Sequence, residues 1–183
     1  KVAMHMELAA IIAACDVAGI LVLVLKGGYL GPVVYNNVAL REMLDLDVLV
    51  RREQLGAADA LLRDRGYRPS DADLPAVATD AHNHAPALRK TGAANVEVHW
   101  NLTLPNLSTS IDPTGLWDSA VPAPRIAPTA RTLSPEEMLL HLCLHASYQR
   151  RFEISLRPFC AVDRLIRVSP ALDWEVVTDS SQR

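Results

Sequence analysis

The sequence predicts an α+β fold in which a mixed sheet with flanking helices, residues 1–132, is followed by a helical region, residues 133–183. In the first part, helical apolar spacing alternates with short β-branched runs, whereas the second part shows helical spacing throughout. Hydrophobic residues make up 50% of the 183 residues and charged residues 21%, which is enough apolar surface for a packed core. We therefore expect about one domain with an appended helical part.

The first two elements share one apolar run, residues 8–25, which is interrupted by Asp16. The Ala-rich first half predicts a helix over 4–17, and the β-branched second half, after Gly19, predicts a buried strand over 20–26. A membrane-spanning helix is rejected because Asp16 would lie near its centre, at a cost of about 2.5–3.5 kcal/mol. Neither a membrane span nor a cleavable signal is therefore expected.

Between residues 29 and 132 the pattern changes every few residues. Alternating apolar and polar residues predict strands, apolar spacings of three and four predict helices, and five prolines predict irregular structure over 104–132. The expected elements, in order, are a short helix over 29–35, a strand over 44–50, a helix over 52–65 ended by Gly66, a loop over 69–80, strands over 85–89 and 95–101, and a helical turn over 114–119.

A strong helix start opens the helical region. Ser134 suits the N-cap, Pro135 the first helical position and Glu137 the third, where its carboxylate can reach back to the cap. The expected helices run to residue 149, over 156–168 and from 171 onward, and the leucines expected to face inward are Leu139, Leu140, Leu142 and Leu144.

Charge and cysteine usage exclude several classes. Lys and Arg total 18 and Asp and Glu total 21, a net charge of −3 that disfavours a nucleic-acid partner. The cysteines are Cys15, Cys143 and Cys160, an odd number without a CxxC pair, so neither a disulfide scaffold nor a cysteine metal site is expected. We expect reduced thiols in a cytoplasmic protein.

Two carboxylates alternate along the strand expected over 44–50. Asp45 and Asp47 share one strand face about 6.5 Å apart, whereas Leu46 and Val48 point to the other face. A solvated strand face would explain the pair, but carboxylates in an apolar strand also suit a cation between them. Mg²⁺ prefers oxygen ligands and is bound together with substrate phosphates. The pattern favours a metal site that holds a nucleotide.

A third carboxylate lies on the strand expected over 95–101. Glu97 and His99 share one face, and Val96 and Val98 share the other. If this strand lies beside the first, Glu97 faces the two aspartates, and the three carboxylates could bridge two metal ions for an in-line phosphoryl displacement. A surface glutamate on an edge strand is the alternative. For His99, packing beneath Trp100 is favoured over a role in orienting a ligand.

The pair Gly27-Gly28 follows the first strand and opens a short helix. Exposed backbone N–H groups there can bind phosphate oxygens, and the Lys26 ammonium can add a charge, although a solvated charge at the strand end is equally open. The segment is neither a Walker loop nor a GxGxxG loop.

Taken in order, these segments form a recognisable combination: Leu25-Lys26-Gly27-Gly28, then Tyr35, Arg41-x-x-x-Asp45-x-Asp47-Val48-Leu49-Val50, Val96-Glu97-Val98-His99-Trp100, and a run from Ser134 to His145 with Asp163 later. The combination resembles the uncharacterised nucleotidyltransferase family of the polymerase-β-like nucleotidyltransferase superfamily, over roughly residues 8–175. Two features depart from it. Leu44 stands where a small residue is commoner, and members usually continue with more helices after a segment like Asp173-Trp174-Glu175, so the helical region is expected to be truncated at its C-terminus.

The resemblance implies a metal-dependent nucleotidyltransferase. Such an enzyme transfers a nucleoside monophosphate from a nucleoside triphosphate such as ATP to a hydroxyl acceptor, on a small molecule or a protein side chain. The implied cofactor is Mg²⁺ (or Mn²⁺). For Arg41, contact with phosphate and pairing with Asp45 or Glu42 remain equally open. The implied catalytic and metal-binding residues are Asp45, Asp47 and Glu97, and the implied nucleotide-binding residues are Lys26, Gly27, Gly28 and Arg41.

Two other classes of function remain. The first is a catalytically idle binding or regulatory module, which the presence of Glu97 disfavours. The second is a metal hydrolase that uses His82, His84 and His99. His141 and His145 are expected to pack in the core or between helices, because Leu142 follows His141 where a zinc protease needs Glu. Under the transferase hypothesis, Asn at position 45 or 47 should abolish transfer and leave the fold intact.

Overall fold

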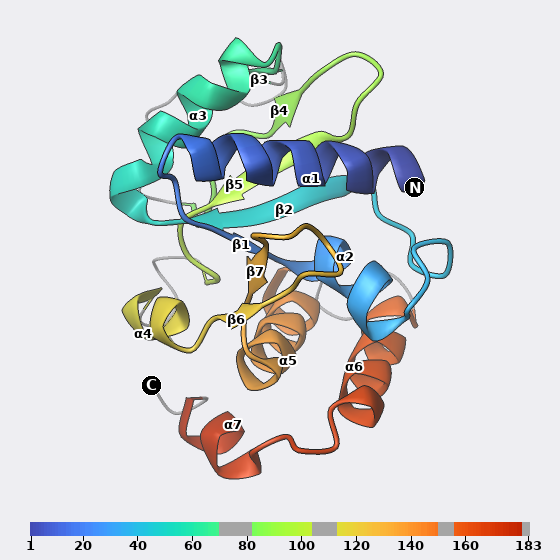
Figure 1. Cartoon of the computed structure of the whole chain (residues 1–183). Helices are drawn as coiled ribbons and strands as arrows, with labels where there is room; N and C mark the ends of the chain where they lie inside the picture. The colour runs from blue at the N-terminus through green and yellow to red at the C-terminus, as the bar shows by residue number, and fades with distance from the viewer. Residues whose placement is uncertain (70–81, 104–112, 150–155, 181–183) are drawn as a thin grey trace.

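The computed structural model describes residues 1–69, 82–103, 113–149 and 156–180. Within them, seven strands form one mixed sheet in the order β3-β4-β5-β2-β1-β7-β6 (Figure 1). The α+β fold class is confirmed. The strands are β1 (Val22–Val24), β2 (Asp45–Val50), β3 (Arg68–Pro69), β4 (Leu88–Arg89), β5 (Asn95–His99), β6 (Val121–Pro122) and β7 (Arg131–Thr132).

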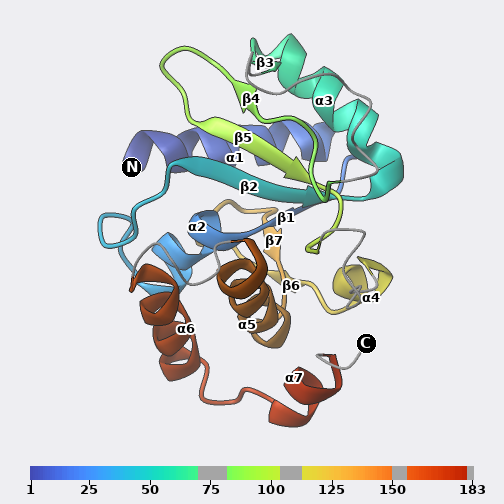
Figure 2. The same ribbon diagram turned by 180° about the vertical axis from the view of Figure 1, so that it is seen from behind.

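The helices lie on two sides of this sheet. Figures 1 and 2 show α1 and α3 beside β2 and β5, and α5, α6 and α7 together beyond β1 and β7. No helix among the described residues is long and apolar enough to cross a membrane. The helices are α1 (Val2–Val17), α2 (Lys26–Tyr29), α3 (Leu55–Asp64), α4 (Pro113–Asp118), α5 (Pro135–Leu144), α6 (Arg157–Val168) and α7 (Trp174–Ser180), with π-helical turns over Leu30–Val34 and His145–Gln149 and a 3-10 turn over Arg52–Gln54.

Several boundaries differ from the expectation. The first strand is shorter than 20–26, because Lys26 already begins α2 with a positive φ of 38°. In the stretch 104–132, α4 matches the helical turn expected over 114–119, but the strands β6 and β7 were not expected. Each contains only two residues and lies near prolines, so no strand period is visible. Most of the loop expected over 69–80, and residues 104–112, lie outside the described residues. The division at residue 132 stays a prediction.

The predicted cap of the first helix in the helical region is confirmed. The Ser134 hydroxyl accepts a hydrogen bond from the Glu137 backbone N–H at 3.2 Å. Leu139 and Leu142 are buried as expected, but Leu140 and Leu144 are half-buried, because the four leucines span more than one face of α5. Met138 and His141 complete the buried face instead.

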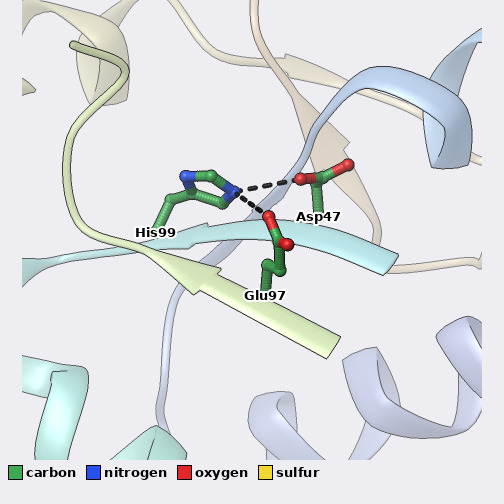
Figure 3. A group of neighbouring side chains, drawn as sticks. All are labelled: Asp47, Glu97 and His99. Carbon is green, nitrogen blue, oxygen red and sulfur yellow. Dashed lines mark hydrogen bonds and ion pairs between the residues drawn. The ribbon is translucent and has the colours of Figure 1, made fainter. Parts of the chain in front are cut away.

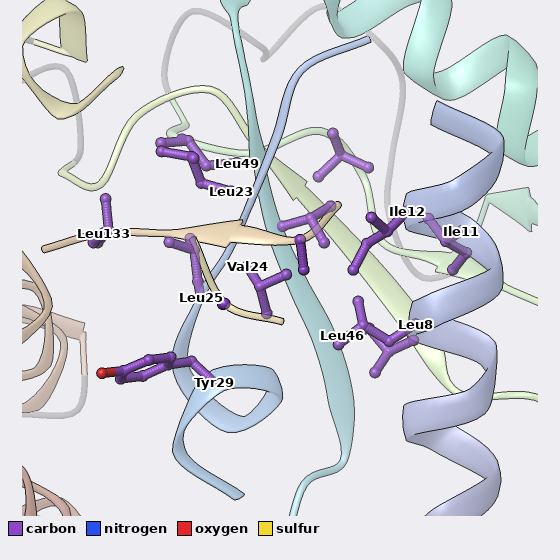
Figure 4. Close-up of a cluster of buried hydrophobic side chains, with 14 of the residues drawn as sticks. Leu8, Ile11, Ile12, Leu23, Val24, Leu25, Tyr29, Leu46, Leu49 and Leu133 are labelled. Carbon is purple, nitrogen blue, oxygen red and sulfur yellow. The ribbon is translucent and has the colours of Figure 1, made fainter. Parts of the chain in front are cut away.

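The core lies between α1 and the sheet and continues toward α5. Leu8 and Ile12 of α1 point toward Leu46 and Val24 in the central strands (Figure 4), and Ile11 is also buried. This packing extends to the start of α2, where a Cβ on Gly28 would lie 2.7 Å from Val24 Cγ1 and 2.9 Å from Leu8 Cδ2. Glycine at 28 therefore lets α2 approach the core. Cys15, Cys143 and Cys160 are all free thiols.

Candidate active site

The strand register brings the carboxylates together. Strands β2 and β5 are parallel neighbours, with Asp47 directly opposite Glu97 and Asp45 opposite Asn95. The prediction that the strand of Asp45 lies next to the strand of Glu97 is confirmed. Because side chains alternate along a strand, His99 falls on the same face as Glu97. Two hydrophobic strands thus present a polar cluster on one face.

Asp47, Glu97 and His99 form a compact group (Figure 3). His99 Nε2 lies 3.0 Å from Asp47 Oδ1 and 3.6 Å from Glu97 Oε2. One ligand atom from each of the three residues lies within 4.8 Å of the others, as a divalent cation would require. The donor set therefore fits a metal ion. Histidine 99 was expected to pack, although its strand face already indicated a place in the site.

Lys26 supplies a cation to the same aspartate. Its Nζ donates a hydrogen bond to Asp47 Oδ1 at 2.7 Å, and both side chains are buried. The positive φ of Lys26 is a conformation that costs a non-glycine residue on the order of 1–3 kcal/mol, so the surrounding packing must hold it. In this structure the Lys26 ammonium is bound to a carboxylate, and its predicted contact with phosphate stays a prediction.

These partners set the protonation states of the group. Burial opposes ionisation of Asp47, but the Lys26 ammonium and the His99 ring outweigh it and hold the pKa of Asp47 below its usual range. The hydrogen bond from His99 lowers the pKa of Glu97. Burial would lower the pKa of His99, yet its bonds to Asp47 and Glu97 raise it. Asp47 and Glu97 are therefore held ionised, and both carboxylates contact the His99 ring.

Asp45 lies at the edge of this cluster rather than inside it. Its carboxylate is only partly buried and does not belong to the compact group. Burial and the repulsion of Asp47 and Glu97 raise the pKa of Asp45. The two aspartates, equivalent in the sequence pattern, thus have opposite electrostatic environments. Asp47 is neutralised by cations, and Asp45 is left with excess negative charge.

Arg41, Gly27 and Gly28 lie at the border of the cluster. Arg41 Nη1 donates to the Glu42 backbone carbonyl at 3.0 Å, and the fields of Asp47 and Asp45 reach its guanidinium. A Cβ on Gly27 would lie 2.9 Å from Met43 Cγ, so both glycines are required by packing. Their backbone role toward phosphate stays a prediction.

The histidines divide into two sets. His82, His84 and His99 lie in a row, with ring centroids 6.1 Å and 5.2 Å apart, but His82 and His84 join no group of three metal-ligating atoms within the described ranges. The hydrolase site is therefore not assembled. His141 of α5 is completely buried, and neither ring nitrogen has a hydrogen-bond partner in the described part of the chain. Burial, with the charges of Lys26 and His99, keeps the pKa of His141 well below its usual value.

Comparisons with known proteins agree with this architecture. The model of a family described as uncharacterised nucleotidyltransferase matches residues 1–183. No curated protein matches the chain.

Similar solved structures include the antibiotic-resistance factor ANT(2'')-Ia in solution, with TM-score 0.66, 15% identity, and coverage of 97% of this chain and 89% of that one. A crystal structure of ANT(2")-Ia with adenylyl-2"-tobramycin gives TM-score 0.64, 15% identity, and coverage of 97% and 94%. The lincosamide antibiotic adenylyltransferase LnuA, bound to lincomycin, gives TM-score 0.58, 16% identity, and coverage of 87% and 94%. At these identities the likeness concerns the fold.

Proposed function

The chain belongs to the uncharacterised nucleotidyltransferase family and is an enzyme of that class. From this premise we propose that it transfers a nucleoside monophosphate from ATP or another nucleoside triphosphate to the hydroxyl group of a small molecule. The observation that carries the proposal is the parallel register that sets Asp47 beside Glu97, with His99 on the same face. Two similar folds bind adenylylated tobramycin and lincomycin, which supports a small hydroxyl-bearing acceptor over a protein side chain.

In the proposed reaction, the acceptor oxygen attacks the α-phosphorus, the bond from that phosphorus to the bridging oxygen breaks, and pyrophosphate leaves. The acceptor proton passes to the Glu97 carboxylate, which the hydrogen bond from His99 keeps ionised, although the same bond lowers the pKa of Glu97 and makes it a weaker base. Asp47 and Glu97, with Asp45 beside them, would hold a divalent cation such as Mg²⁺. A cation bound there supplies positive charge to the phosphate oxygens.

The cationic residues around the carboxylates would bind the triphosphate. Lys26 and Arg41 place positive charge beside Asp47, which would otherwise repel phosphate. The backbone N–H groups of Gly27 and Gly28 would contact phosphate oxygens at the start of α2. These assignments make Lys26 and Arg41 residues that lower the KM for the nucleotide.

The test combines purified protein, each of four nucleoside triphosphates, Mg²⁺ or Mn²⁺, and a panel of hydroxyl-bearing small molecules including aminoglycosides and lincosamides. We expect pyrophosphate release with one acceptor class and a product heavier by one nucleoside monophosphate in mass spectrometry. Glu97→Gln should abolish release, whereas Asp163→Asn, an exposed carboxylate on α6, serves as the matched control. Nucleotide binding without turnover of any acceptor would favour the idle module instead.

A further inference from the structure

The imidazole of His99 stands where a metal ligand would stand. We propose that His99 Nε2 ligates the divalent cation together with Asp47 and Glu97, and that this mixed nitrogen and oxygen set makes the site prefer Mn²⁺ to Mg²⁺. The inference rests on the proposed function, which requires a cation at the carboxylates, and it goes further by assigning the third ligand and the kind of metal.

The distances in the cluster are those between ligands of one ion. Two ligand atoms each about 2.1 Å from a cation are about 3.0 Å apart at right angles and about 3.6 Å apart at a wider angle near 118°. His99 Nε2 is 3.0 Å from Asp47 Oδ1 and 3.6 Å from Glu97 Oε2. A cation could therefore contact all three residues after small side-chain shifts.

The orientation of the ring also indicates this role. His99 is 1% exposed, and its Nδ1 has no hydrogen-bond partner within the described ranges. Nε2 alone makes polar contacts, and Figure 3 shows it directed between the two carboxylates. The ring is thus held by the same two groups that would share a cation with it. A histidine that served only as packing would have no need to bring a nitrogen to this point.

The cluster already holds a positive charge. The Lys26 ammonium lies 2.7 Å from the same Asp47 Oδ1 that His99 contacts. Asp45 and Glu97 add two more carboxylates within electrostatic reach of Asp47, and Arg41 adds a second cation, so with a neutral His99 ring three carboxylates face two basic side chains. This excess attracts a further cation, and the excess is buried enough for water to screen it only partly.

Ligand chemistry then decides which cation binds best. Mg²⁺ prefers oxygen ligands and keeps much of its water, whereas imidazole nitrogen suits the first-row transition metals. Two carboxylates and one imidazole suit Mn²⁺, which accepts both ligand types. Carboxylate-only sites also bind Mn²⁺, so the two ligand sets are distinguished by the effect of removing the imidazole and by nitrogen coupling to the bound ion.

The first test measures binding of Mn²⁺ and Mg²⁺ to the wild-type chain by calorimetry, without nucleotide. We expect Mn²⁺ to bind at least about tenfold more tightly than Mg²⁺. His99→Gln keeps a polar side chain in the cluster but removes the nitrogen ligand, and it should weaken Mn²⁺ binding by about tenfold or more. His84→Gln is the matched control, because His84 lies beside His99 but outside the group of ligating atoms, and it should leave both affinities unchanged.

The second test begins with the wild-type chain, so its first outcome does not depend on the folding of a variant. Pulsed electron paramagnetic resonance on the wild-type Mn²⁺ complex should show coupling to a histidine nitrogen, which shifts when the protein is labelled with ¹⁵N-histidine. The proposal is overturned if the wild-type complex shows no nitrogen coupling, or if the coupling persists in His99→Gln. Equal affinity for Mn²⁺ and Mg²⁺ also overturns it. Nitrogen coupling in a protein that transfers no nucleotide would refute the proposed function and leave His99 as a ligand.

Discussion

Two pairs of an aspartate with a basic residue, one joining α2 to the sheet and one on α6, have similar geometry and different surroundings. Lys26 Nζ and Asp47 Oδ1 are 2.7 Å apart, with side chains 11% and 3% exposed. Arg167 Nε and Asp163 Oδ2 are 2.9 Å apart, with side chains 69% and 59% exposed. An exposed pair contributes little, whereas breaking a buried pair strands a charge in the interior. Burial, rather than distance, decides what each pair does for the fold.

The two pairs also form in different ways. Asp163 and Arg167 are four residues apart on one helix, so helical geometry alone brings them together. Lys26 and Asp47 come from α2 and β2, and His99 reaches the same carboxylate from β5. The buried cluster therefore depends on the assembled sheet, and substitutions there should affect stability and function together.

The largest effect is expected from Asp47→Asn. The substitution leaves the buried Lys26 ammonium without its hydrogen-bonded carboxylate partner, so the free energy of unfolding should fall by about 3–5 kcal/mol at pH 7. Urea denaturation of the metal-free protein measures the change. The sequence pattern alone led us to expect an intact fold for this variant, because it does not reveal that Asp47 is the partner of a buried lysine.

A double variant identifies the cause. Adding Lys26→Met to Asp47→Asn removes the unpaired charge, and most of the lost stability should return. If Asp47→Asn alone loses less than about 1 kcal/mol, the Lys26 ammonium reaches water and the pair behaves like the exposed one on α6.

His141→Leu should have the second largest effect, with the opposite sign. The buried imidazole has no hydrogen-bond partner in the described part of the chain, so an apolar side chain of similar size should raise the free energy of unfolding by about 1–2 kcal/mol. Thermal denaturation at pH 7 measures it. A loss of stability would show that the imidazole makes a favourable interaction, and would extend the polar cluster from the sheet to α5.

Asp45→Asn should stabilise the protein by less than about 1 kcal/mol, since the carboxylate is partly exposed and water screens it. Burial and the neighbouring carboxylates raise the pKa of Asp45, so the folded state binds its proton more tightly than the unfolded state does. Stability of the wild type therefore falls as pH rises through that raised pKa. The gain in the variant should be present above this pKa and vanish below the unfolded value of about 3.9. An equal gain at both ends of this pH range would contradict the electrostatic cause.

The smallest effect is expected from Asp163→Asn. The hydrogen bond with Arg167 lowers the pKa of Asp163, but both side chains lie in solvent. The midpoint of thermal unfolding should not change measurably at physiological ionic strength. A clear decrease in this midpoint would show that the Asp163–Arg167 pair contributes to stability. Asp163 could then no longer serve as the exposed pair with which Asp47 is compared.

Part of the candidate site could be predicted from the alternation of polar and apolar residues along the strands. Asp45, Asp47 and Glu97 were identified because every second residue of a strand faces the same way. His99 lies on that same face, but a histidine beside Trp100 is as readily explained by packing. Strands β3, β6 and β7 contain two residues each, which is too few for a period to show. From the sequence we assigned Lys26 a contact with phosphate. The position of a lysine at the end of a strand does not show which carboxylate it contacts in the folded protein.

Local backbone geometry is what the sequence by itself determined: which residues share a strand face, that Ser134 starts α5, and that an apolar run divides into helix and strand at Gly19. Tertiary structure decided the partners. The parallel register of β2 and β5 sets Asp47 against Glu97, and α2 brings Lys26 to Asp47 across 21 positions of the chain. Alternation repeats within a few residues, whereas register is chosen by which faces can be buried together, and burial is a property of the whole sheet.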